Sequence, residues 1–141
     1  MPTRTQKWII NLVDGLEKNV DNQVTTKVLE NCGRNCQSQS FVRKAKKIYE
    51  KSEDTKDFLK NLSRVYKNLH VEGDKVYIIY PKCYCTQVNK IPKGTLSTTY
   101  CNCSKGWAKA LFEGATGKPV EVIKEKTIIS GDDHCRFRII L

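Results

Sequence analysis

Apolar side chains recur every three or four positions through the first half of the chain, a spacing typical of amphipathic helices. The first such segment covers residues 5–18. The same spacing predicts three more helices, one beginning after Asp21 and the last opening at Ser52, because both residue types commonly cap helices. Gly33 is expected to end the helix that follows Asp21. The first 70 residues are therefore predicted to be helical.

The spacing changes to two beyond this point, which indicates strands. Residues 70–80 are predicted to form one hairpin, and residues 120–129 and 135–141 a second. Between the hairpins we expect a strand at about 96–103 and a helix from Ser104 onward. The chain thus has the pattern of an α+β protein, with N-terminal helices followed by an antiparallel sheet interrupted by one helix.

Length and composition indicate a single domain of 141 residues, with a helical part at 1–70 and a sheet-plus-helix part at 71–141. Apolar residues make up 39% of the chain and charged residues 28%, which is typical of a soluble protein. No apolar run is long enough to cross a membrane, and the N-terminal residues lack the apolar stretch of a signal peptide. We therefore expect a cytoplasmic protein without membrane contact, whose thiols stay mostly reduced.

The net charge of +10 raises the question of an acidic partner such as nucleic acid. The densest basic run is Arg43–Lys47, which lies in a helical pattern with Glu50 and Glu53 close behind it. Mixed charges on a helix favour a solvated surface over a nucleic-acid site. Nucleic acid is therefore disfavoured as a partner.

The seven cysteines are the main chemical signal of the chain. Six of them form three close pairs and one stands alone: Cys32 with Cys36, Cys83 with Cys85, Cys101 with Cys103, and Cys135. An odd number fits poorly with a closed disulfide framework, particularly in a reducing compartment. Metal ligation or redox chemistry is the stronger interpretation.

The two Cys-x-Cys pairs have the clearest expected geometry. Residues two apart on a strand point to the same face, so Cys83 and Cys85 are predicted to share a face, and Cys101 and Cys103 likewise. If the two strands are neighbours, four sulfurs can converge on zinc or on an iron–sulfur cluster. The alternative is that these side chains are small buried hydrophobic residues.

The other three cysteines carry weaker signals. Cys32 and Cys36 flank Gly33, which favours a loop between two helices and leaves both a ligand role and ordinary packing open. Cys135 begins a strand whose alternating apolar positions favour burial, although a ligand role stays open.

Cys103 directly precedes the predicted helix start at Ser104. Helix N-termini stabilise anions, so a thiolate at this position is expected to have a lowered pKa. Cys101 or Cys103 is thus the best candidate for the nucleophile or redox cysteine of an enzyme. No general base is evident for such an enzyme, because neither histidine lies beside a cysteine pair in the sequence.

Residues 95–141 contain four motifs in a fixed order: Cys101–Trp107, Phe112–Glu113, Gly117–Val122 and Gly131–Ile139. Together they resemble the C-terminal part of 4-vinyl-reductase-type domains. The resemblance implies a small α+β domain of the kind found in tetrapyrrole enzymes and in prokaryotic regulators that sense ligands or redox state. The whole chain looks like a cysteine-rich prokaryotic family related to that superfamily.

One departure limits what this resemblance implies. Some sensor members of the superfamily hold zinc through a Glu and a Cys on the strand before the last Cys. Here the corresponding strand, at 124–128, reads Lys-Glu-Lys-Thr-Ile and has no cysteine. Only Cys135 matches that zinc site, so further ligands would have to come from the three cysteine pairs.

The sequence predicts a metal-binding or redox-sensing module whose clustered cysteines hold zinc or an iron–sulfur cluster. Two alternatives stay open: a small-molecule enzyme with a cysteine nucleophile or redox pair, and a metal-free domain that binds a small ligand. The expected partner is a metal ion or small ligand, and a protein partner or homodimer is compatible with the pattern.

Overall fold

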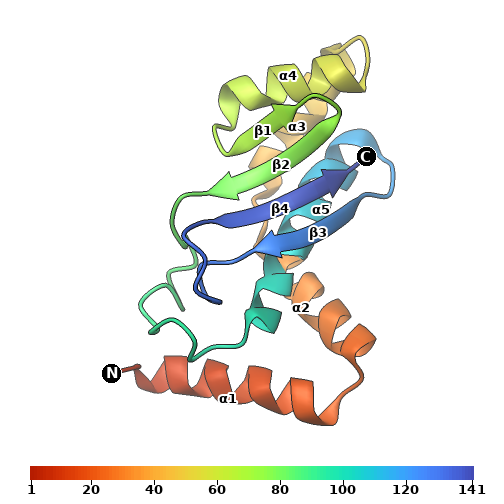
Figure 1. Ribbon diagram of the computed structural model, residues 1–141. Helices are drawn as coiled ribbons and strands as arrows, with labels where there is room; N and C mark the ends of the chain where they lie inside the picture. The colour runs from red at the N-terminus through yellow and green to blue at the C-terminus, as the bar shows by residue number, and fades with distance from the viewer.

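Four helices precede the first strand, as the apolar spacing predicts. The computed structural model covers residues 1–141, and its elements, shown in Figure 1, follow one another in this order: α1 (Arg4–Asn19), α2 (Asn22–Cys36), α3 (Gln39–Lys51), α4 (Thr55–Val65), β1 (Leu69–Glu72), β2 (Lys75–Tyr80), the 3-10 helix η1 (Thr98–Cys101), α5 (Asn102–Thr116), β3 (Glu121–Lys126) and β4 (Cys135–Ile140). The α+β class is thereby confirmed, with N-terminal helices followed by an antiparallel sheet that one helix interrupts.

Local hydrogen bonds explain where the helices begin. The Asp21 carboxylate accepts a hydrogen bond from the backbone N–H of Gln23 at 2.8 Å and caps α2 as expected. The last N-terminal helix begins later than predicted, because Asp54 caps it by accepting from the N–H of Asp57 at 2.7 Å. Ser52 instead ends α3, where its hydroxyl donates to the last turn of that helix.

The sheet is antiparallel throughout, in the order β1-β2-β4-β3. Gly73 has a φ of +63° and makes the tight turn between β1 and β2, a conformation that favours glycine. The central pair joins strands that are distant in sequence, with Ile78 opposite Phe137 and Tyr80 opposite Cys135. The chain that leaves β2 therefore starts beside the residue where β4 begins.

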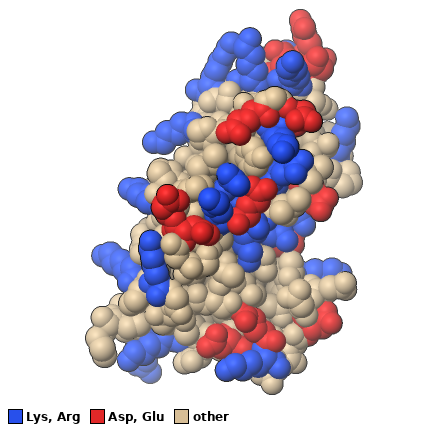
Figure 2. Space-filling model, in the orientation of Figure 1, with Lys and Arg blue, Asp and Glu red and all other residues tan.

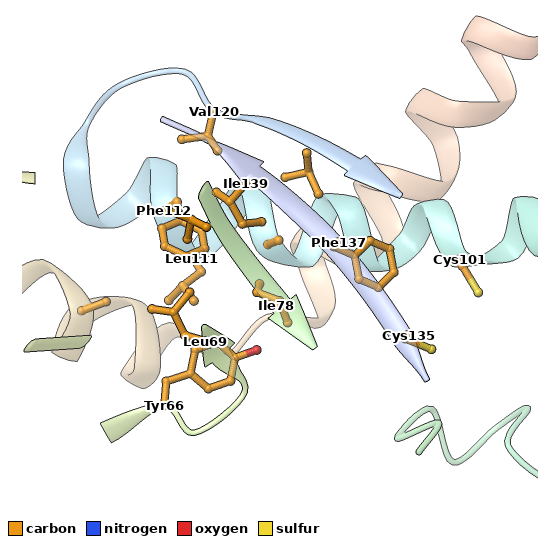
Figure 3. Packing of buried hydrophobic residues seen from close by; sticks show 14 of the residues in the cluster. Tyr66, Leu69, Ile78, Cys101, Leu111, Phe112, Val120, Cys135, Phe137 and Ile139 are labelled. Carbon is orange, nitrogen blue, oxygen red and sulfur yellow. The ribbon is translucent and has the colours of Figure 1, made fainter. Parts of the chain in front are cut away.

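The core lies between this sheet and α5, which covers one of its faces (Figure 1). Leu111 and Phe112 of α5 are completely buried, and they pack with Ile78 and Phe137 from the two central strands. Figure 3 shows these side chains together, with the sulfurs of two cysteines at one end of the cluster.

Two predictions about local structure are wrong. The segment expected as a strand at about 96–103 is a loop followed by η1 and the first turn of α5. The Ser97 side chain accepts a hydrogen bond from the N–H of Thr99 at 3.2 Å, which starts a helical turn that runs directly into α5. Gly33 does not end α2, which continues to Cys36.

Gly33 is instead the point where α2 and α5 touch backbone to backbone. A Cβ atom built on Gly33 would lie 1.7 Å from the carbonyl oxygen of Cys103, and one on Gly106 would lie 1.8 Å from that of Glu30. Helices normally pack with their axes about 8–10 Å apart because side chains separate them. Here two glycines remove that separation, and the resulting interface is the largest between any two elements.

Polar contacts surround this crossing. Lys109 of α5 pairs with Glu30 of α2, and Arg34 pairs with Glu113 at 2.9 Å. Farther along α2, the Gln37 side-chain amide donates to the backbone carbonyl of Trp107 at 3.1 Å. These contacts fix the two helices in one orientation.

The surface carries mixed charge. Figure 2 shows lysine and arginine interspersed with acidic side chains on the face drawn. The basic run at Arg43–Lys47 lies on α3, where Ala45 is buried and the four basic side chains are exposed. None of the helices combines the length and the apolar character needed to cross a bilayer.

The crossing generates a stability prediction. Gly33→Ala should lower the free energy of unfolding by about 3 kcal/mol, because the new methyl group meets backbone that cannot move aside. Gly15→Ala in α1 is the matched control: its Cβ meets open space, so it should raise stability by roughly 0.5–1 kcal/mol through helix propensity. Chemical denaturation of both variants measures the difference, and equal midpoints would contradict the tight crossing.

Candidate functional site

Six of the seven cysteines line one pocket of about 520 Å³. They come from four separate segments of the chain: Cys36, Cys83, Cys85, Cys101, Cys103 and Cys135. The pocket is also lined by seven aromatic side chains: Phe41, Tyr66, Tyr80, Tyr84, Tyr100, Trp107 and Phe137. No Asp, Glu or His lines it, and its charged lining residues are two lysines, Lys67 and Lys82.

The loop after β2 brings the first pair into the pocket. Tyr80, the last residue of β2, pairs with Cys135, the first residue of β4. The loop that carries Cys83 and Cys85 therefore begins beside Cys135. The carbonyl of Cys85 accepts hydrogen bonds from the N–H groups of Val88 at 3.0 Å and Asn89 at 2.8 Å, which makes a turn. Val88 is almost completely buried and anchors this turn to the core.

The second pair lies at the start of α5. Cys101 is the N-cap residue of that helix and is buried, whereas Cys103 lies in its first turn and is partly buried. Cys135 is buried across from Cys101, at the same end of the core (Figure 3). Its sulfur accepts a hydrogen bond from the N–H of Ile128 at 3.3 Å.

The third pair belongs to α2. Cys32 and Cys36 lie four residues apart on a continuous helix, so they share one face. The prediction of a loop at this pair is wrong because Gly33 is needed inside α2 for the contact with α5. Both thiols are exposed, and Cys36 reaches the pocket while Cys32 is not part of its lining.

The structure thus groups the cysteines as the sequence suggests, but by a different geometry. The two Cys-x-Cys pairs lie on a loop and on a helix start, not on adjacent strands. All seven cysteines are free thiols. No three Cys, His, Asp or Glu side chains form a group that could hold a metal ion.

The thiols differ in acidity. A hydrogen bond from the Cys85 thiol lowers the pKa of Cys83 below the ordinary value, and the same interaction, together with burial, raises the pKa of Cys85. Burial raises the pKa of Cys101 to about 12. The Cys83–Cys85 pair therefore loses one of its two protons more readily than Cys101 loses its proton.

The expected low pKa at Cys103 is wrong. Burial, with smaller contributions from the neighbouring Cys32 and Cys36 thiols, raises the pKa of this thiol to about 11. Desolvation of the charged form and repulsion between thiolates outweigh the attraction of the helix N-terminus. The best candidate for a reactive thiolate is Cys83.

Tyrosine hydroxyl groups add hydrogen-bonding capacity to the pocket. The hydroxyls of Tyr66 and Tyr80 lie 2.8 Å apart, and burial raises the pKa of both residues. The Tyr100 hydroxyl accepts a hydrogen bond from the Gln87 amide at 2.7 Å, which leaves its own proton free to donate. Neutral tyrosines of this kind can donate to sulfur or to a bound ligand.

These tyrosines are not among the site residues that the sequence predicts. Four of the six tyrosines in the chain line the pocket. Two of them could have been found from their position next to the cysteines in sequence. Tyr84 lies between Cys83 and Cys85, and Tyr100 directly precedes Cys101.

Comparison with known proteins places the whole chain in one family. Residues 2–141 match the model of DUF6144, a family of unknown function, so the chain belongs to that family. A comparison with curated proteins gives no match. The resemblance to 4-vinyl-reductase-type domains stays a prediction.

The acidity of the loop pair is directly testable. Cys83 should be alkylated by iodoacetamide with a pH midpoint below the ordinary thiol value of about 8.5. Cys85→Ala removes the side-chain donor and should move that midpoint upward, which slows alkylation of Cys83 at pH 7 by roughly tenfold. Cys103→Ala is the control and should leave the midpoint unchanged. Mass spectrometry of each cysteine peptide gives the rates, and a wild-type midpoint at or above the ordinary value would contradict the shift.

Proposed function

We propose that this DUF6144 member binds an iron–sulfur centre in its cysteine pocket and serves as a redox-responsive module of the cytoplasm. The observation that carries the proposal is the gathering of six cysteines from four segments around one pocket that has no carboxylate or imidazole. Soft thiolate ligands select soft metals and iron–sulfur clusters over magnesium or calcium.

Four cysteines are the best ligands for such a centre: Cys83, Cys85, Cys101 and Cys135. Cys83 is central to this set, because its negative charge contributes to the raised pKa values of Cys85, Cys101 and Cys135. That electrostatic influence requires the sulfurs to lie near one another. Iron–sulfur clusters are commonly held by four cysteine thiolates.

Pocket size favours a cluster over a single zinc ion. A structural zinc site needs four ligands that converge at about 2.0–2.3 Å from one point, and no three Cys, His, Asp or Glu side chains of this structure form a group that could hold a metal ion. A cluster has several iron atoms, so its ligands approach from separated positions around a larger volume. The pocket of about 520 Å³ supplies that volume.

The surroundings suit a negatively charged centre. Lys67 and Lys82 line the pocket without any acidic partner there. Neutral tyrosine hydroxyls, including that of Tyr100, can donate hydrogen bonds to sulfur. Charge and hydrogen bonds near the sulfurs are among the factors that set the reduction potential of a cluster.

Metal analysis tests the proposal. Protein purified without oxygen, or reconstituted with ferrous iron and sulfide, should contain stoichiometric iron and sulfide and absorb visible light. The double variant Cys83→Ala/Cys85→Ala should lose nearly all bound iron, whereas Cys32→Ala should retain it, because Cys32 does not line the pocket. Bound zinc in place of iron would overturn the choice of a cluster. Absence of both metals, with seven titratable thiols, would overturn the metal function altogether.

A second candidate function follows from the aromatic side chains of the pocket. Phe41, Tyr66 and Trp107 form a cluster with ring centroids 5.4–6.4 Å apart, and small-molecule sites are typically apolar and aromatic. The pocket would then hold a flat apolar ligand without metal, which also agrees with the ligand-sensing regulators that the chain resembles.

A fluorescent probe tests this second candidate. Anilinonaphthalene sulfonate should bind the native protein in the micromolar range and quench the emission of Trp107. Trp107→Phe should abolish the quenching, whereas Trp8→Phe should preserve it, because Trp8 lies exposed on α1. Equal quenching in the two variants would place the probe outside the pocket.

A further inference from the structure

Three thiols at the α2–α5 crossing are not used by the proposed centre. They are Cys32 and Cys36 on α2 and Cys103 on α5. Gly33 lies between the two α2 cysteines in sequence, and its backbone contacts the carbonyl of Cys103. The backbone of Cys103 therefore lies at a point where the two helices have no side chain between them.

This close approach favours a disulfide between the two helices. A disulfide needs Cα atoms about 4.4–6.8 Å apart and Cβ atoms about 3.5–4.5 Å apart. Helices at ordinary separation seldom satisfy these limits, and the backbone contact at Gly33 places α2 and α5 closer together than that. Cys36 and Cys103 also line the same pocket, which independently brings cysteines of α2 and α5 to one surface.

Pairing within α2 is less favourable. Residues four apart on a helix have Cβ atoms about 5–6 Å from each other, which is beyond the disulfide range. Cys32 and Cys36 therefore cannot join without local unwinding of α2. The alternative partner for each is Cys103, on the other side of the contact at Gly33.

We infer that Cys103 forms a reversible disulfide with one of the two α2 cysteines when the protein meets a peroxide. The exposed thiol on α2 attacks the peroxide as a thiolate, breaks the O–O bond and becomes a sulfenic acid, and one water leaves. Cys103 then attacks that sulfur and a second water leaves as the S–S bond forms. Overall, two thiols are oxidised by two electrons and hydrogen peroxide is reduced to two waters.

The bond would join the helical half of the chain to the wall of the pocket. Cys36, Cys103 and Trp107 all line the pocket, and the Gln37 amide already ties the end of α2 to the Trp107 carbonyl. Because the helices are in contact before oxidation, the crosslink preserves the fold and restricts separation of α2 from α5. This modification goes beyond the proposed metal function and needs no metal to form.

Disulfide mapping tests the inference in metal-free, fully reduced protein. After treatment with hydrogen peroxide, peptide mass spectrometry should find Cys103 linked to Cys32 or Cys36, with two fewer titratable thiols. A thiol reductant should restore both. Cys103→Ser should abolish the linkage, and the double variant Cys32→Ser/Cys36→Ser should do the same. Each single α2 variant should retain a linkage through the remaining cysteine.

Other results would overturn the inference. A Cys32–Cys36 disulfide, a linkage between α5 and the loop at 83–85, or oxidation of Cys103 to a sulfinic acid without any linkage would each do so. Circular dichroism of the Ser variants confirms that they fold, so loss of the linkage is not loss of structure. Because the protein contains no metal in this experiment, its outcome is separate from that of the iron-binding test.

Discussion

The backbone contact between Gly33 and the first turn of α5 is the constraint on which the rest of the structure depends. It fixes where α5 begins relative to the N-terminal helices. The same helix then supplies Leu111 and Phe112 to the core beneath the sheet. A single close approach therefore sets both the junction between the two halves of the chain and the position of Cys101 and Cys103.

The pairing of β2 with β4 is the second constraint, and it acts from the opposite side of the pocket. It places Cys135 beside the end of β2, from which the loop carrying Cys83 and Cys85 departs. Burial of Val88 holds that loop against the core. The pocket thus forms between the α2–α5 crossing and the β2–β4 pairing. Both contacts join segments that are distant in sequence.

The dependence of the pocket on contacts between distant segments explains what could be predicted from the sequence. Helices and hairpins follow from local spacing, and Asp21 caps α2 because its partner is two residues away. The role of Gly33 does not follow from the sequence, because a glycine that ends a helix cannot be distinguished there from one that allows close contact with a neighbouring helix. The strand predicted at about 96–103 is absent for a similar reason, because a local turn at Ser97 replaces strand pairing. Which cysteines meet depends on contacts across the chain, which spacing alone does not encode.

The acidity of the thiols follows from the same geometry. Gathering several thiols in a partly buried pocket makes their charged forms repel one another and lose solvation, so burial raises the pKa values of Cys101, Cys103 and Cys135. Neutral thiols are then the stable form when no cation is present. A bound soft cation reverses both effects, because it replaces the lost solvation and screens the repulsion, and the thiols release their protons on binding. Cys83 needs no such release, since the Cys85 thiol already stabilises its charge. In the proposed iron–sulfur centre, Cys83 and Cys85 would therefore be the first ligands to bind, and the buried thiols of Cys101 and Cys135 would follow.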